Sequence, residues 1–289
     1  MKRVLFFVLL FSLNAMAAEK VDQVLDVVAD GKVEISNVRG DIDIEGWDKA
    51  QVHVKGRLDE ITESFIFKTE GKVTHIKVKL PQNTRMRGHS GSKLKIFVPN
   101  PSNVVFQGVA TDVSIKGVSG GVDVTSVSGN VALEQIAKHV YVNNVSGDLD
   151  FNGVKGALEV STVSGNVKAI VMSRDIQVSA VSADVNVKTE EVENLKVSTV
   201  SGDAKVKGQL AENGNVRMSC VNGEATFDFV GDVDADVNLQ TGPGGDIYNK
   251  LTSHEPKTSF IQDKQLRFTV GKGQGSVKMT TVSGSISVK

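Results

Sequence analysis

Oxygen-bearing side chains recur at one position of a repeat, and the spacing would bring them into a single column if the repeats stacked. An Asn, Asp or Glu follows a Val-Ser-Gly-like triplet about every 18 residues. The series is Asn130, Asp148, Asn166, Asp184, Asp203 and Glu224. Calcium binds oxygen ligands of this kind, so the column is a candidate cation site.

Two features favour a structural role for the column over a calcium site. The known calcium roll uses a Gly-Gly-x-Gly-x-Asp pattern at nonapeptide spacing, and the chain lacks that pattern. The turns half-way between carry Lys138, Lys155 and Arg174, whose charge repels a cation. Because Asn and Asp also bond the local backbone in tight turns, the sequence favours a turn-forming ladder and predicts neither a metal nor a cofactor.

A second candidate site is a short basic segment between residues 85 and 93. Its cationic side chains are Arg85, Arg87, His89 and Lys93. They are candidates to contact an anion, such as an acidic glycan or a lipid head group. The alternative is a solvated surface loop, since loops run over protein surfaces and commonly carry charge.

Other patterns with catalytic associations have simpler explanations here. Residues 117–121 spell Gly-x-Ser-x-Gly, but this hydrolase motif requires a strand-to-helix elbow, and no helix is predicted after it. The five His residues show no metal-ligand spacing to one another or to a Cys. Residues 39–41 spell Arg-Gly-Asp, an integrin-type recognition tripeptide, but they fall where other copies read Ser-Gly-Asp, so the match is taken as coincidence. We therefore predict no catalytic residue, and a polysaccharide-active enzyme remains the least favoured alternative because spatial clusters cannot be read from one sequence.

The positions of these residues are set by an internal repeat. Copies of Val-Ser-Gly-Asp/Asn-Val begin at residues 127, 145, 163, 181, 200 and 221, with weaker copies half-way between them. The separations are 18, 18, 18, 19 and 21 residues, so the full period is about 18 and is made of two halves. An early copy begins at Val38 and a late one at Val282.

Each half of the repeat reads as a strand, a turn and a strand. Apolar and small polar residues alternate outside the turn, as in Val160–Ala169, which is typical of a strand with one buried face. The turn glycine permits a positive φ. One coil buries too little surface to be stable alone, whereas stacked coils close a continuous core. The sequence thus predicts an all-β fold, a repeat-built β-solenoid, over the alternatives of a β-sandwich or a β-propeller.

Composition agrees with this fold and argues against one class of partner, nucleic acid. Aromatic residues make up 5% of the chain, which suits narrow coils filled by Val, Ile and Leu. The net charge of −1 argues against nucleic acid as a partner, because phosphate binding needs an excess of Lys and Arg on one face. The single cysteine, Cys220, cannot form an internal disulfide and is predicted to be a buried apolar residue.

The chain divides into four predicted segments. Residues 1–17 have a basic start, a short apolar run and an Ala-x-Ala end, which is typical of a cleaved secretory signal peptide. Residues 19–100 are predicted to form an N-terminal β cap region, 101–240 the regular coils, and 241–289 a C-terminal β capping segment that includes strands at 260–270 and 276–289. No later stretch is long and apolar enough to span a membrane, so we expect an exported chain in the periplasm, at the cell surface or in the medium.

Several of these features together resemble a known family. They are the signal peptide, the segment Val33–Ile42, the Gly46-Trp47-Asp48 turn, the strand Leu94–Pro99 and the run of Val-Ser-Gly-Asp/Asn repeats. This combination resembles the bacterial putative adhesins, a family with a domain of unknown function. The resemblance implies a stacked β-solenoid and surface attachment, and it brings no catalytic residues.

Two functions follow as hypotheses. The first is a non-enzymatic, exported adhesin-like module that binds a glycan or another extended ligand through its face of small polar residues. The second is a periplasmic structural or scaffold protein whose partner is another protein of the cell envelope.

Overall fold

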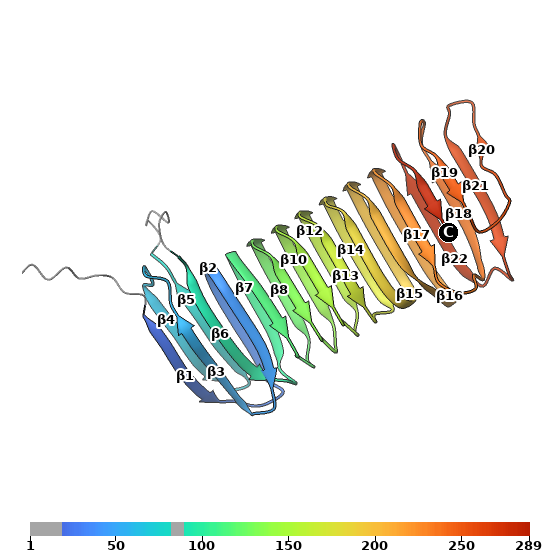
Figure 1. Cartoon of the computed structure of the whole chain (residues 1–289). Helices are drawn as coiled ribbons and strands as arrows, with labels where there is room; N and C mark the ends of the chain where they lie inside the picture. The colour runs from blue at the N-terminus through green and yellow to red at the C-terminus, as the bar shows by residue number, and fades with distance from the viewer. Residues whose placement is uncertain (1–18, 82–89) are drawn as a thin grey trace, which may run out of the picture.

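The chain forms a rod of stacked β-coils (Figure 1). The computed structural model describes residues 19–81 and 90–289, and within them it contains strands and turns but no helix. The all-β solenoid predicted from the repeat is therefore confirmed. The predicted signal peptide lies outside the described residues.

The strands fall into three groups along the rod. The N-terminal end contains β1 (Lys20–Asp26), β3 (Gln51–Arg57), β4 (Ser64–Glu70), β5 (Val73–Lys79) and β6 (Ser92–Pro99). The coils are built from β2 (Lys32–Trp47), β7 (Asn103–Lys116), β8 (Val122–Ser128), β9 (Val131–Glu134), β10 (Val140–Ser146), β11 (Leu149–Asn152), β12 (Leu158–Ser164), β13 (Val167–Val171), β14 (Asp175–Ser182), β15 (Val185–Ser201), β16 (Ala204–Asn222) and β17 (Ala225–Phe229). The C-terminal end contains β18 (Ala235–Thr241), β19 (Ile247–Asn249), β20 (Lys257–Thr258), β21 (Lys264–Val270), β22 (Gly275–Thr281) and β23 (Ile286–Val288).

The coils stack in parallel with the register that the repeat predicts. β10 pairs with β12 so that Val140 lies opposite Leu158, and β11 pairs with β13 so that Leu149 lies opposite Val167, each an offset of 18 residues. The offset between β14 and β15 is 19, and the pairing of β15 with β16 contains register shifts between residues 188 and 194 of β15. The strands before and after each Val-Ser-Gly turn thus form two separate stacks.

We call these stacks the first sheet, made of strands that precede the turns, and the second sheet, made of strands that follow them. The first sheet runs through β8, β10, β12 and β14, and the second through β9, β11 and β13. The long strands β2, β7, β15 and β16 bend and contribute to both. β2 already stacks in parallel on β7 over most of its length, although it lies in the predicted N-terminal region.

Antiparallel strands appear only toward the two ends of the described stack. β4 pairs with β5, and β1 pairs with β3, which in turn pairs with β6. At the other end β21 runs antiparallel to both β18 and β20. The strand predicted from residue 260 begins instead at Lys264, because residues 259–262 form the tight turn between β20 and β21.

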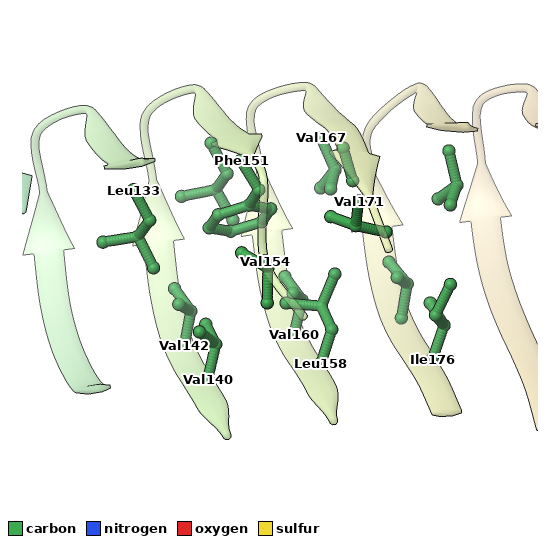
Figure 2. Close-up of a cluster of buried hydrophobic side chains, with 14 of the residues drawn as sticks. Leu133, Val140, Val142, Phe151, Val154, Leu158, Val160, Val167, Val171 and Ile176 are labelled. Carbon is green, nitrogen blue, oxygen red and sulfur yellow. The ribbon is translucent and has the colours of Figure 1, made fainter. Parts of the chain in front are cut away.

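The core is a narrow, packed layer of apolar side chains between the two sheets (Figure 2). Alternate residues point inward, so Val140 and Val142 of β10 face Phe151 of β11 across the coil. These side chains are at most 1% exposed. Burying a side chain of this kind contributes about 1.5–3 kcal/mol relative to exposure, which accounts for the stacking of coils that could not fold singly.

Candidate binding surface

The turn between the two sheets depends on a glycine at the same place in most coils. Gly129, Gly147 and Gly165 have φ of 127°, 123° and 109°. A Cβ at Gly147 would lie 2.2 Å from the carbonyl oxygen of Gly129 in the coil before it. Glycine is therefore required both by the backbone conformation and by the close approach of neighbouring coils.

The predicted oxygen column is present, and its members form hydrogen bonds between the turns of successive coils. In each coil a side-chain oxygen accepts a hydrogen bond from the backbone N–H of the equivalent residue in the next coil. The donor–acceptor pairs are Asn130 N to Asp112 Oδ1, Asp148 N to Asn130, Asn166 N to Asp148, Asp184 N to Asn166, Asp203 N to Asp184 and Glu224 N to Asp203. The donor–acceptor distances are 2.7–3.3 Å.

These hydrogen bonds give the column a structural role that the sequence favoured. The backbone N–H of Glu224 lowers the pKa of Asp203, and Lys205 acts in the same direction. One oxygen of each braced side chain is already used as an acceptor. No group of three or more His, Cys, Asp or Glu suited to a metal occurs within residues 19–81 and 90–289. That the column binds no calcium stays a prediction.

A line of exposed valines runs beside the ladder and was not anticipated from the sequence. One Val at the start of the turn in successive coils points outward, whereas the apolar residue after the turn is buried. The exposed members are Val109, Val127, Val145, Val163, Val181, Val200, Val221 and Val282, each 37–55% exposed. At a strand spacing of about 4.8 Å, this valine stripe is about 34 Å long.

Uncharged side chains, all polar except Ala110, flank the valine stripe on both sides. The column on the sheet side is Gln107, Thr125, Asn143, Ser161, Ser179, Ser198, Ser219 and Thr280, in register from coil to coil. The column on the turn side is Ala110, Ser128, Ser146, Ser164, Ser182, Ser201, Asn222 and Ser283. Together the three columns form a surface without a formal charge, which we call the valine face.

The valine face is shallowly hollowed. A depression of about 240 Å³ lies between the polar column at Ser161 and Ser179 and the stripe at Val163 and Val181. A larger hollow of about 440 Å³ lies at the N-terminal end of the first sheet, where Glu34 pairs with Lys32 and His75. Lys32 lowers the pKa of Glu34 by a hydrogen bond to its carboxylate.

The second sheet presents a different surface. Its outward side chains include ion pairs between successive coils, such as Lys116 with Glu134 at 2.9 Å and Lys168 with Asp150 at 3.6 Å. Exposed pairs of this kind contribute little to stability. The valine face therefore differs in chemistry from the second sheet: the valine face is uncharged and hydroxyl-rich, and the second sheet is charged.

Of the predicted anion-contacting segment, Lys93 lies among the described residues. Arg85, Arg87 and His89 lie outside the described residues. Lys93 is on β6 and pairs with Asp41 at 3.1 Å. The Arg39 guanidinium is buried and bonded to the carboxylate of Asp59, with Nη2 to Oδ1 at 2.9 Å, so it is not displayed as a recognition tripeptide would require.

Two other positions are now placed. Residues 117–121 form a bend between β7 and β8, with no helix to make a nucleophile elbow. Cys220 is 1% exposed, and burial raises the pKa of its thiol, as expected of a core cysteine. The described residues contain no helix long and apolar enough to cross a membrane.

Comparison with known proteins assigns the family. A family model described as Toastrack DUF4097 matches residues 27–289, nearly the whole of the described chain. The chain belongs to the Toastrack DUF4097 family. The resemblance seen in the repeats is confirmed by this match. No curated protein sequence matches this Toastrack chain.

Three solved structures are similar to it at low sequence identity. A putative cell adhesion protein from Clostridium sporogenes is 11% identical, with 94% of this chain and 99% of that one covered and a TM-score of 0.24. A putative adhesin from Bacteroides fragilis is 11% identical, with coverage of 94% and 98% and a TM-score of 0.42. A putative lipid binding protein from Parabacteroides distasonis is 16% identical, with coverage of 93% and 96% and a TM-score of 0.35. At these scores the similarities decide nothing about this chain.

Proposed function

We propose that the chain is a non-enzymatic, exported binding module that holds an extended ligand along its valine face. The observation that carries the proposal is the uncharged surface formed by the valine stripe and its two flanking columns. Every coil repeats the same chemistry, so a long ligand meets the same contacts at each step.

A glycan chain fits this surface in kind. Sugar rings present apolar C–H patches beside hydroxyl groups, and the valine stripe lies between Ser, Thr and Asn side chains that both donate and accept hydrogen bonds. A neutral surface also imposes little desolvation cost, because burying charges is far more expensive than burying hydroxyl groups that find partners. Each coil contributes weakly, and affinity comes from the number of coils engaged.

The test is co-sedimentation of the chain with chitin, cellulose and isolated peptidoglycan. Replacing Val145, Val163 and Val181 with Thr keeps the side-chain shape but removes apolar contact, and it should weaken retention by at least about tenfold, a change of about 1.4 kcal/mol. The matched control is Ile170→Thr, which alters an equally exposed aliphatic residue on the second sheet. Equal loss in both variants, or retention unchanged by the triple substitution, would rule out the valine face.

Location is tested separately, by proteolysis of intact cells with a periplasmic control protein. Cleavage of the chain while the control survives supports a surface adhesin. Protection until the outer barrier is opened favours the alternative of a periplasmic scaffold, with an envelope protein as partner.

A further inference from the structure

The turn that joins β20 to β21 presents two neighbouring apolar side chains to solvent. Phe260 is 99% exposed and Ile261 is 67% exposed, whereas the other large apolar side chains of the described residues are at most 55% exposed. Neither residue belongs to the core or packs against it. A fully exposed ring beside an exposed Ile is a feature that folding of the rod does not require.

Hydrogen bonds hold this pair at the apex of the turn. The backbone N–H of Ser259 donates to the carbonyl of Asp263 at 2.9 Å, and that of Gln262 donates to the carbonyl of Ser259 at 3.1 Å. The N–H of Ile261 bonds the Ser259 hydroxyl at 3.2 Å. The turn is thus closed, and the two apolar side chains are kept from folding back onto the rod.

The hairpin also carries the pair away from the stacked coils. The pairing of β18 with β21 ends at Thr241 opposite Lys264, and the turn lies beyond that last pair. In Figure 1 the hairpin projects at the C-terminal end past the line of the coil turns. Nothing in the described chain covers the tip.

We propose that this tip inserts reversibly into the surface of a lipid bilayer. A stable protein–protein interface buries about 1,200–2,000 Å², and a narrow turn with two apolar side chains between Ser259 and Gln262 supplies only a small part of that. Binding to a bilayer does not require a partner surface of complementary shape, because the apolar side chains enter the boundary between head groups and acyl chains. The adjacent Lys257 is exposed and has no ion-pair partner among the described residues, so it suits anionic head groups.

The expected binding is weak and reversible. Burying a side chain such as Phe or Ile raises partitioning by about 10- to 100-fold each. Together they raise partitioning by about 10²- to 10⁴-fold, so the tip binds a bilayer more weakly than a single myristoyl chain, whose own membrane binding is reversible. This inference does not rest on the valine face, which lies on the coils and binds its ligand independently.

The experiment uses the single tryptophan of the chain. Trp47 lies on β2 at the opposite end of the rod and serves as the negative reporter in the wild type. The double substitution Trp47→Phe and Phe260→Trp moves the only tryptophan to the tip. Both forms are titrated with phosphatidylcholine vesicles, with and without phosphatidylglycerol, and with brominated lipid as a quencher.

Insertion predicts a blue shift and quenching of the tip tryptophan, with no change at Trp47. Adding Ile261→Ser to the reporter form should raise the lipid concentration at half-maximal shift by about tenfold or more, whereas adding Tyr248→Ser, at another exposed residue of the same end, should not. A tip tryptophan that is neither shifted nor quenched overturns the proposal. A shift that depends on protein concentration without vesicles also overturns it, in favour of a contact between two copies of the chain.

Discussion

At the scale of single residues, the turn glycines are the most constrained positions. Gly147 combines a φ of 123° with a carbonyl oxygen of the neighbouring coil where a Cβ would lie. Gly117 shares the positive φ, at 69°, but has no atom within 4 Å of its Cβ position. The pair separates two reasons for glycine that usually occur together, backbone conformation and lack of space.

We expect Gly147→Ala to destabilise the chain by at least about 1–3 kcal/mol, since both strain and a backbone clash oppose the methyl group. Gly117→Ala should cost about 1 kcal/mol, because only the conformational penalty remains. Urea unfolding followed by circular dichroism measures both. Equal losses would mean that the carbonyl of the neighbouring coil moves away freely.

The buried ion pair of Arg39 and Asp59 is a second residue-scale determinant. It fixes the loop after β3 to the first coil, and both side chains are at most 10% exposed. Asp59→Asn should destabilise the chain by about 3–5 kcal/mol, because it removes the carboxylate to which the buried guanidinium is bonded. The exposed pair of Lys68 and Glu70 is the control, and Glu70→Gln should leave stability nearly unchanged. Thermal unfolding compares the two, and similar losses would contradict the importance of burial.

At the scale of elements, the ladder connects each turn to the next through a side-chain oxygen. The interaction is a hydrogen bond from a neutral N–H to a carboxylate or amide, so it stabilises both Asp and Asn coils. The carboxylates add a pH dependence that the amides lack. Asp203 is the member whose pKa is lowered by this arrangement.

We expect stability to fall in acid through Asp203, whose pKa is lowered in the folded chain. A carboxylate with a lowered folded-state pKa contributes fully above its unfolded value of about 3.9, and the contribution is lost as the pH falls through the folded value. Asp203→Asn keeps an acceptor oxygen but loses the charge, so it should lower stability at pH 7 and reduce the further loss between pH 4 and pH 2. Urea midpoints of both forms at several pH values test this, and parallel curves would contradict it.

The elements also show what could be predicted from the sequence. The period of 18 was enough to predict the stacking of the coils and the ladder from Asn130 to Glu224. In a parallel stack, residues that are one period apart in the sequence lie next to each other in space. The valine stripe was missed, although its signal was present: Val160 and Thr162 point inward, so strict alternation places Val163 outward. The tip at Phe260 was missed for another reason, since an apolar pair beside β-forming residues reads as the start of a strand.

At the scale of the whole molecule, the rod is a one-dimensional stack in which each coil contacts its two neighbours. Stability is then close to a sum of coil and interface contributions. The register of 18 between β10, β12 and β14 means that a full coil can be removed without changing how the remaining strands pair.

Deletion of residues 147–164 should therefore leave a folded rod, shorter by about 4.8 Å. The junction joins Ser146 to Gly165 and restores a Val-Ser-Gly-Asn turn. Deletion of nine residues, 147–155, is the control and should fail to fold. Nine residues are half a coil, so strands of the second sheet would be shifted to positions of the first sheet. Circular dichroism and small-angle scattering distinguish the outcomes, and an unfolded 18-residue deletion would contradict the additive picture.

The 18-residue register from β8 to β14 has a consequence for inheritance. One coil corresponds to 18 codons, or 54 nucleotides, and similar turns begin every coil. Slippage or recombination between neighbouring copies would add or remove a complete unit in frame, and the product would keep every hydrogen-bonding partner. Genes for such chains should consequently differ in length by whole multiples of this unit, so that natural selection can adjust the reach of the rod without altering its chemistry.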